Sequence, residues 1–143
     1  MLTDATVQAL LAMSKHFVDV STIYFPQPGQ QLQRELKSQD TRESFLLDIG
    51  RGRIKIGKCT YQNRYHVTEI LLRLDIDGPP HVNPDGETVP CPHLHVYREG
   101  YADKWAGPID PTEFTNTADL VLTLRQFLTR CKVERCPEIQ GAL

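Results

Sequence analysis

The stretch 90–100, PCPHLHVYREG, holds the residues best suited to chemistry: a cysteine, two histidines, a tyrosine and an arginine. Successive side chains in a strand point to opposite faces of the sheet. If this stretch is a strand, one face carries its chemically active side chains, which are Cys91, His93, His95 and Tyr97. The other face carries Leu94 and Val96. The pattern therefore predicts a strand with one chemical face and one core face.

The histidine pair suits metal-free cleavage of RNA by a general acid and a general base. One imidazole takes the proton of the 2′-hydroxyl group, and the other protonates the leaving oxygen. Histidine fits both roles because its ordinary pKa lies near neutral pH. Nearby cations stabilise the charged transition state. We predict that His93 and His95 are the acid–base pair, and that the cations are Arg73, Arg98 and Lys104.

Metal binding is the second hypothesis for the same histidines. A His-x-His pair on a strand presents two imidazoles on one side, about 7 Å apart, and a third group could complete a site. The candidates for that group are Asp77, His81 and Cys91. The second ligand pair of a zinc finger or zinc ribbon is missing, so we expect no cofactor and no tightly held divalent metal. Recognition without chemistry is the third hypothesis.

Periodicity predicts the elements that position these residues. Apolar residues at helical spacing predict an N-terminal helix over 3–17, capped by Thr3, and a C-terminal helix over 117–133. Alternating patterns predict five strands, at 31–39, 44–50, 53–65, 70–77 and 92–99. Because most connections are short, we expect an antiparallel meander. The predicted fold class is α+β, a mainly antiparallel five-stranded sheet with both helices packed on one face.

The alternation also predicts a polar face opposite the helices. In the third strand, Ile54 and Ile56 share the core face, and the opposite face carries Arg53, Lys55, Cys59, Tyr61 and Asn63. In the fourth strand, the polar face carries Arg73, Asp75 and Asp77. Cations contact phosphates and aromatic rings stack on bases. We therefore predict substrate binding by Arg53, Lys55, Tyr61, His81, Tyr97, Tyr101 and Trp105.

Plainer interpretations remain for each of these features. An antiparallel sheet commonly has one polar face that serves only solubility. The turn signal Asn-Pro-Asp-Gly at 83–86 is typical of a rigid loop, which would make His81 a rim residue. Tyr101 and Trp105 are also typical anchors of a loop against the core. The density of histidines favours a site, since His81, His93 and His95 fall within 15 residues.

Composition narrows the class of protein. The 143 residues are 40% hydrophobic and 24% charged, which predicts one globular domain over 1–143. The net charge of −2 gives no general signal for nucleic acid, so a basic surface must be local. No membrane span or basic leader is apparent, and the four cysteines contain no CxxC pair. We expect a cytoplasmic protein with free thiols.

The segments LLRLDIDGPPH, NPDGE and PCPHLHVYREGYADKW resemble a signature of short, uncharacterised bacterial proteins from chromosomes and mobile elements. The resemblance covers roughly residues 45–105 and implies no activity. A helix followed by an antiparallel sheet is also similar, at the level of fold, to the RelE and barnase-like ribonuclease toxins. Those toxins are usually basic, whereas this chain is weakly acidic.

The leading functional prediction is a toxin-like endoribonuclease or related phosphodiesterase, with RNA as substrate and a cognate antitoxin or other protein as partner. The alternative is a non-enzymatic binding or inhibitory module, such as an anti-defence or regulatory protein. That module would use the same face for a protein partner. Neither prediction involves a membrane.

Overall fold

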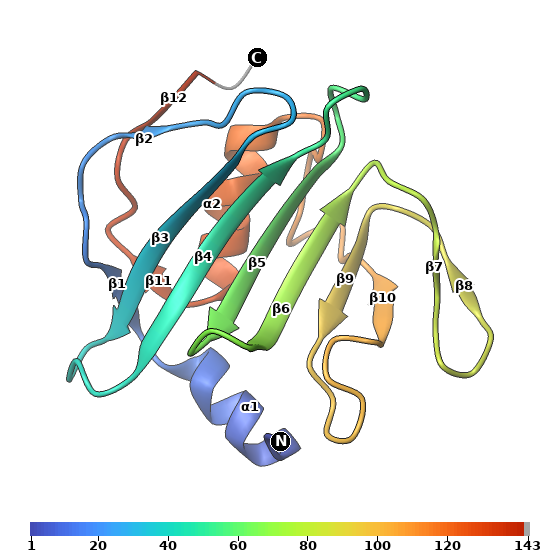
Figure 1. The fold of residues 1–143 in the computed structure, drawn as a ribbon, viewed down its shortest axis with the longest axis horizontal. Helices are drawn as coiled ribbons and strands as arrows, with labels where there is room; N and C mark the ends of the chain where they lie inside the picture. Colours follow the sequence, from blue (N-terminus) through green and yellow to red (C-terminus); the bar gives the residue numbers. More distant parts are fainter. Residues whose placement is uncertain (142–143) are drawn as a thin grey trace.

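A computed structural model describes residues 1–141 of the chain. Its centre is an eight-stranded sheet with the order β10-β9-β6-β5-β4-β3-β1-β11 (Figure 1). Its strands are β1 (Lys15–Phe17), β3 (Gln31–Ser38), β4 (Ser44–Arg51), β5 (Cys59–Tyr65), β6 (Glu69–Ile76), β9 (His93–Val96), β10 (Ala106–Pro108) and β11 (Val133–Glu134). Neighbouring strands are antiparallel except for β1 and β11, which are parallel.

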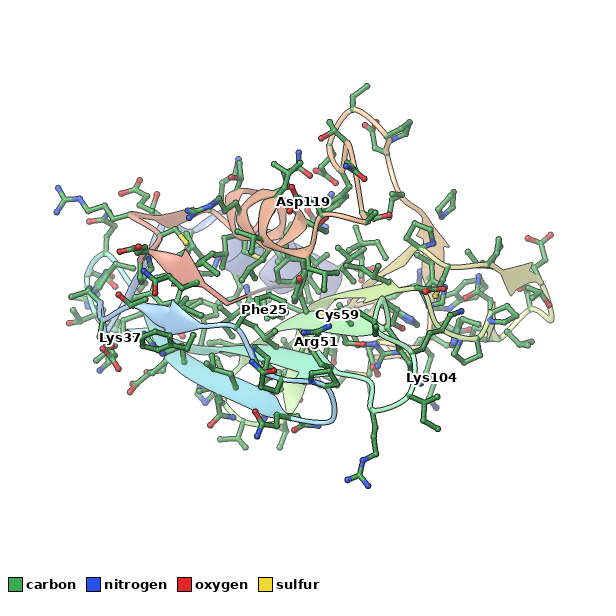
Figure 2. The ribbon with its side chains drawn as sticks, turned by 90° about the horizontal axis from the view of Figure 1, so that it is seen from above. Phe25, Lys37, Arg51, Cys59, Lys104 and Asp119 are labelled. Carbon is green, nitrogen blue, oxygen red and sulfur yellow. The ribbon has the colours of Figure 1, made fainter. Side chains whose placement is uncertain are left out.

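Two small sheets and two helices complete the described part of the chain. Strand β2 (Ile23–Tyr24) pairs with β12 (Ile139–Gln140), and β7 (His81–Val82) pairs with β8 (Thr88–Val89). Helix α1 (Asp4–Ala12) and helix α2 (Leu120–Arg130) both lie on one side of the central sheet (Figure 2). Neither helix is long and apolar enough to cross a membrane.

The predicted five-stranded sheet is wrong, because the sheet has eight strands and is mixed. The five predicted strands correspond to β3, β4, β5, β6 and β9, which form an antiparallel meander in the expected order. The added strands β1, β10 and β11 contain only two or three residues each. Alternation over so few residues gives no readable pattern.

Both helices are shorter than predicted. Helix α1 is capped by Thr3 as expected, since the Thr3 side chain accepts a hydrogen bond from the Thr6 N–H, but it ends at Ala12. The chain turns extended at Met13 and then forms β1, which pairs with β3. Helix α2 starts at Leu120, because the Asp119 side chain accepts a hydrogen bond from the Leu122 N–H and caps it.

The third predicted strand is wrong over residues 53–58. This segment is a loop closed by hydrogen bonds from Lys58 N–H to the Lys55 carbonyl and from Gly52 N–H to the Lys58 carbonyl. Ile54 and Ile56 are exposed rather than buried. Strand β5 therefore begins at Cys59 in the opposite phase to the one predicted, and its core-facing residues are Cys59, Tyr61 and Asn63.

The core lies between the helices and one face of the sheet. Alternate residues of β4 and β6 supply aliphatic and aromatic side chains to it, among them Phe45, Leu47 and Leu74. Helix α2 covers them with Leu124 and other residues of its apolar stripe. The opposite face of the same strands is left for polar side chains, and that face carries the candidate site.

Candidate functional site

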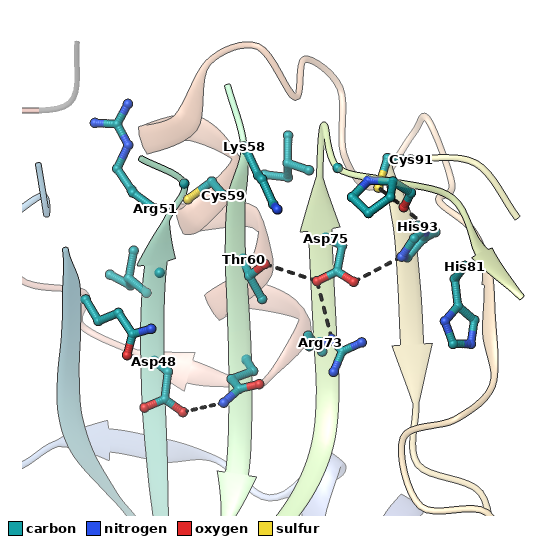
Figure 3. A pocket seen from close by; sticks show the side chains of 18 of the residues that line it. Asp48, Arg51, Lys58, Cys59, Thr60, Arg73, Asp75, His81, Cys91 and His93 are labelled. Carbon is teal, nitrogen blue, oxygen red and sulfur yellow. Dashed lines mark hydrogen bonds and ion pairs between the residues drawn. The ribbon is translucent and has the colours of Figure 1, made fainter. Parts of the chain in front are cut away.

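The pairing of β6 with β9 brings four polar side chains together on the face opposite the helices. Arg73 lies directly across from His95, and Asp75 lies directly across from His93. Side chains of directly opposed residues are close enough to interact. This register therefore assembles a cluster of two imidazoles, one carboxylate and one guanidinium. Figure 3 shows Arg73, Asp75 and His93 of this cluster.

Asp75 is the centre of the cluster. Its Oδ2 lies 3.0 Å from His93 Nε2 and 3.2 Å from His95 Nε2, and its Oδ1 accepts a hydrogen bond of 3.1 Å from the Thr60 hydroxyl. Burial opposes ionisation of this carboxyl group, but the contacts with His95 and His93 and the charge of Arg73 hold its pKa well below the ordinary value. Asp75 is a carboxylate at neutral pH.

The hydrogen bonds of His95 place a proton on Nδ1. The Asp103 carbonyl can only accept, so His95 Nδ1, 2.8 Å away, carries a proton. His95 Nε2 lies 3.0 Å from an Arg73 guanidinium nitrogen, which can donate to it, and 3.2 Å from Asp75 Oδ2, which can accept from it. Arg73 also donates to the Asp103 carboxylate at 2.8 Å. His95 is thus held by the Asp103 carbonyl at Nδ1 and by Arg73 and Asp75 at Nε2.

In His93 the proton lies on Nε2. Its Nε2 donates to Asp75, which leaves the lone pair of Nδ1 free to accept. The atom facing Nδ1 is the sulfur of Cys91, at 3.6 Å. A thiol is a weak hydrogen-bond donor, so Nδ1 remains available as a base.

Both histidines are buried, which corrects the predicted exposed pair. His93 is 1% exposed and His95 is 0% exposed, whereas Leu94 on the core face is 8% exposed. The two imidazoles do lie on the face opposite the helices, as alternation predicts. They are covered by His81, whose ring centroid lies 4.6 Å from that of His95 and 5.9 Å from that of His93.

His81 is the more accessible third imidazole. Its Nε2 lies 2.7 Å from the Lys104 carbonyl, so Nε2 carries the proton and Nδ1 is left without this restraint. The residue is half-buried. The hairpin of β7 and β8 therefore delivers a histidine to the rim of the cluster.

The cluster opens into a groove of about 890 Å3 that crosses the polar face of the sheet (Figure 3). Its lining includes His81, His93, Asp75, Arg73 and Cys91 at one end, while His95 is not part of the lining. Along the floor, polar side chains follow β3, β4 and β5: Gln33, Asp48, Gln62 and Arg64. A groove of this volume and polarity accommodates an extended polar ligand.

The cations of the groove differ in availability. Arg64 is held by Asp48 in a pair of hydrogen bonds of 2.6 and 2.9 Å. Arg73 contacts Asp75 and Asp103 but keeps part of its guanidinium accessible. Lys58 is exposed and forms no ion pair within residues 1–141. Lys58 and Arg73 are therefore the cations that a ligand in the groove can reach.

Two predicted binding residues line a separate hollow. Arg53 and Lys55 belong to the loop 52–58 and border a cavity of about 460 Å3 that shares Gly52, Lys58, Gly78 and Pro79 with the groove. The Lys55 ammonium group forms an ion pair of 2.7 Å with Asp77. These residues thus lie beside the groove rather than in it.

Five other predicted site residues lie away from the groove. Tyr61 and Tyr97 are buried in the core, against the prediction that they lie on the polar face. The Tyr61 hydroxyl donates to the Leu120 carbonyl of α2 at 2.7 Å. Arg98 stacks on Trp105, and Trp105 contacts Tyr101 edge to face.

Lys104 contributes its backbone rather than its charge. Its carbonyl orients His81, while its side chain is exposed. Thr60, Asp75 and Asp103 hold the cluster together, and none of the three was a predicted site residue. Alternation in the β6 segment places Asp75 on the same face as the histidines, so its position near them was predictable from the sequence.

The donor set of Asp75, His93 and His95 also fits a divalent metal in kind. Their candidate ligand atoms lie within 4.8 Å of one another, and zinc prefers imidazole and carboxylate donors. Arg73, however, contacts both the Asp75 carboxylate and Nε2 of His95. A guanidinium in that position already balances the charge of Asp75, so a metal ion would have to displace it.

Comparison with known proteins identifies the family. Residues 2–133 match a family of unknown function, DUF6978. The chain belongs to this family. The match to DUF6978 spans every residue that lines the groove, and it confirms the expectation of an uncharacterised family. No curated protein and no solved structure matches the chain.

Proposed function

We propose that the chain cleaves phosphodiester bonds of RNA in the groove, as an endoribonuclease or related phosphodiesterase. The observation that carries the proposal is the presence of two imidazoles, His81 and His93, in the lining of one groove together with Arg73. Cleavage through the 2′-hydroxyl group needs a base, an acid and a cation, and it needs no cofactor.

His93 is the general base. Its Nδ1 lies beside Cys91 in the groove lining, and the Asp75 carboxylate on Nε2 stabilises the imidazolium that forms when Nδ1 takes a proton. The 2′-oxygen of the substrate then attacks phosphorus. His95 does not line the groove, so it positions Asp75 and Arg73 rather than transferring a proton.

His81 is the general acid, in place of the predicted His95. In its imidazolium form, Nε2 donates to the Lys104 carbonyl and Nδ1 donates to the leaving 5′-oxygen as the bond between phosphorus and that oxygen breaks. The products are a 2′,3′-cyclic phosphate and a free 5′-hydroxyl group, so every proton is accounted for. Arg73 and Lys58 contact the phosphate and stabilise its added charge.

We propose further that the chain has a toxin-like role, although its DIDGPPH, NPDGE and PCPHLH segments imply no activity by themselves. Those segments supply Asp75, His81 and His93 to the cluster. A toxin of this kind acts on cytoplasmic RNA and is neutralised by a small antitoxin protein. The analogy to RelE-like toxins is weaker, since it rests on the arrangement of elements alone.

The proposal is tested with purified protein and two oligonucleotides of one sequence, single-stranded RNA and its 2′-deoxy form. We expect cleavage of the RNA only, with a bell-shaped pH profile and no effect of a chelator. His93→Gln and His81→Gln should each lower the rate about 10²–10⁴-fold, which is the usual contribution of a positioned acid or base.

His66→Asn is the matched control. His66 is exposed in the turn after β5 and has a positive φ of 55°, a conformation that Asn tolerates. This variant should cleave like the parent chain. Intact RNA at every pH between 5 and 9, combined with saturable RNA or protein binding, would instead support the binding module.

A further inference from the structure

We propose that Cys91 is a base-activated nucleophile and that the groove has a second, thiol-dependent activity on activated acyl compounds, through a thioester intermediate. This activity goes beyond the proposed RNA cleavage, because it needs neither a nucleotide nor His81. It assigns a catalytic role to a cysteine that the RNA reaction does not use.

The first support is the order of three side chains. Cys91 Sγ lies 3.6 Å from His93 Nδ1, and His93 Nε2 lies 3.0 Å from Asp75 Oδ2. A thiol, an imidazole and a carboxylate that contact one another in this spatial order have the roles of nucleophile, base and orienting group. The proton positions agree, since His93 Nε2 donates to the carboxylate and Nδ1 is free to take the thiol proton.

Asp75 makes further contacts besides the one with His93. Its second oxygen accepts from the Thr60 hydroxyl at 3.1 Å, and Arg73 lies 3.3 Å from that same oxygen. These contacts fix the carboxylate that orients His93. A fixed orienting group keeps the imidazole in the tautomer that the reaction needs.

The second support is access. Cys91 is half-buried and lines the groove, so a ligand in the groove can reach its sulfur. Cys59 and Cys131 are each 1% exposed, and burial raises the pKa of both thiols to about 11. Cys136 is half-buried, and its sulfur contacts the carbonyl of Pro137, whereas the sulfur of Cys91 contacts His93 as well as the carbonyl of Pro79, at 3.7 Å.

The third support is the charge around the reacting carbonyl. The Lys58 side chain and the Cys91 sulfur both lie close to Gly78, because a Cβ added to Gly78 would lie 3.8 Å from Cys91 Sγ and 3.7 Å from Lys58 Cε. Both residues line the groove, so a ligand bound at Cys91 lies near the Lys58 side chain. A cation there stabilises the negative oxygen that forms when a thiol attacks a carbonyl.

The reaction follows from these positions. Cys91 Sγ forms a bond to the acyl carbon as its proton passes to His93 Nδ1, and the leaving group departs with that proton. Water then attacks the thioester with His93 again as base, which releases the carboxylic acid and restores the thiol. Burial, followed by the charges of Asp75 and Asp77, raises the pKa of Cys91 above its ordinary value, so the proton leaves during attack rather than before it.

The test uses the full chain and 4-nitrophenyl acetate. We expect release of nitrophenolate and one acetyl group on Cys91, located by mass spectrometry of peptides. Cys91→Ala should abolish the acetylated peptide, and Asp75→Asn or His93→Gln should slow acetylation about 10²–10⁴-fold. Cys136→Ala is the control, since it removes the other half-buried thiol and should leave the rate unchanged.

Iodoacetamide labelling provides a measurement that does not depend on the fold of the variants. In the parent chain, Cys91 should be alkylated faster than Cys136. Equal rates at the two cysteines, or acetylation that persists in Cys91→Ala, would overturn the inference. RNA cleavage by the parent chain is measured separately. Acylation of Cys91 without RNA cleavage would contradict only the proposed function. RNA cleavage without acylation of Cys91 would contradict only this inference.

Discussion

At the scale of single residues, the site depends on which nitrogen of each histidine carries a proton. The Asp103 carbonyl places a proton on His95 Nδ1, and the Asp75 carboxylate places one on His93 Nε2. Both imidazoles contact Asp75 Oδ2 through Nε2, but their Nδ1 atoms face different partners, the Asp103 carbonyl and the Cys91 sulfur. His93 therefore keeps an Nδ1 lone pair beside a residue that lines the groove.

The first prediction concerns Arg73 and zinc. Because its guanidinium balances the charge of Asp75 beside the two histidines, Arg73→Gln should let the cluster bind zinc at least ten times more tightly than the parent chain. Isothermal titration with zinc measures both affinities. Arg64→Gln, in the same groove, is the control and should change little. About one equivalent of zinc in the purified parent chain would contradict the prediction.

The second prediction concerns acid stability. Asp75 keeps its carboxylate to a lower pH in the folded chain than in the unfolded chain, so the unfolded chain binds more protons just below the ordinary pKa of 3.8. The stabilisation by Asp75 is therefore complete above about pH 4 and is lost as the pH falls further. Asp75→Asn should show a weaker loss of stability over that range in urea unfolding. Parallel curves for the two chains would refute this assignment.

The candidate site was partly predictable from sequence. Alternation correctly places His93 and His95 on the face opposite the helices, but it cannot predict that another segment covers them. The contacts of His81 and Asp103 with the pair come from loops and a hairpin outside the strand, whose paths alternation does not predict. Side-chain chemistry alone was a poor guide to Tyr61, whose ring and hydroxyl serve the core.

At the scale of elements, the phase of one strand explains the errors at Ile54, Ile56 and Tyr61. The loop at 52–58 contains two glycines and two isoleucines, and the isoleucines imitate a strand with a buried face. Since β5 starts only at Cys59, its alternation is offset by one position from the predicted pattern. A shift of one residue moves every side chain of a strand to the other face. The long strands β3, β4 and β6 have no such interruption and were predictable.

The third prediction tests how β5 holds helix α2. Tyr61→Phe removes the hydroxyl that donates to the Leu120 carbonyl but keeps the ring, so it should lower the free energy of unfolding by about 0.5–1.5 kcal/mol. Tyr24→Phe is the control, because Tyr24 is 68% exposed. Chemical unfolding measures both variants. An unchanged stability in Tyr61→Phe would mean that this hydrogen bond contributes nothing net.

At the scale of the whole molecule, one buried lysine joins the two helices. The Lys15 ammonium group donates to the carbonyls of Met13, just after α1, and Cys131, at the end of α2, at 3.0 and 2.7 Å. Cations near helix C-termini interact favourably with the helix dipole. The side chain is fully buried, and burial lowers its pKa from 10.5 to about 8.

The fourth prediction follows from that pKa. Between about pH 8 and 10.5 the unfolded chain holds a proton on Lys15 that the folded chain has lost, so Lys15 makes the free energy of unfolding rise with pH across this window. Lys15→Met removes the contribution. The stability of the parent chain minus that of Lys15→Met should therefore increase from pH 8 to 10.5. A difference that stays constant would show that Lys15 titrates alike in both states.

The short strands at the two ends of the central sheet have a consequence for self-association. An unpaired sheet edge offers backbone N–H and carbonyl groups to another chain, and long edges promote aggregation. Here β4 and β5 are paired along their length on both sides, β3 pairs with β1 over Leu36, Lys37 and Ser38, and the outermost strands are β10, with three residues, and β11, with two. Strand β10 also ends in Pro108, which has no N–H to donate. An incoming strand would find only a few hydrogen bonds at β10 or β11, so neither outermost strand favours extension of the sheet into a fibril.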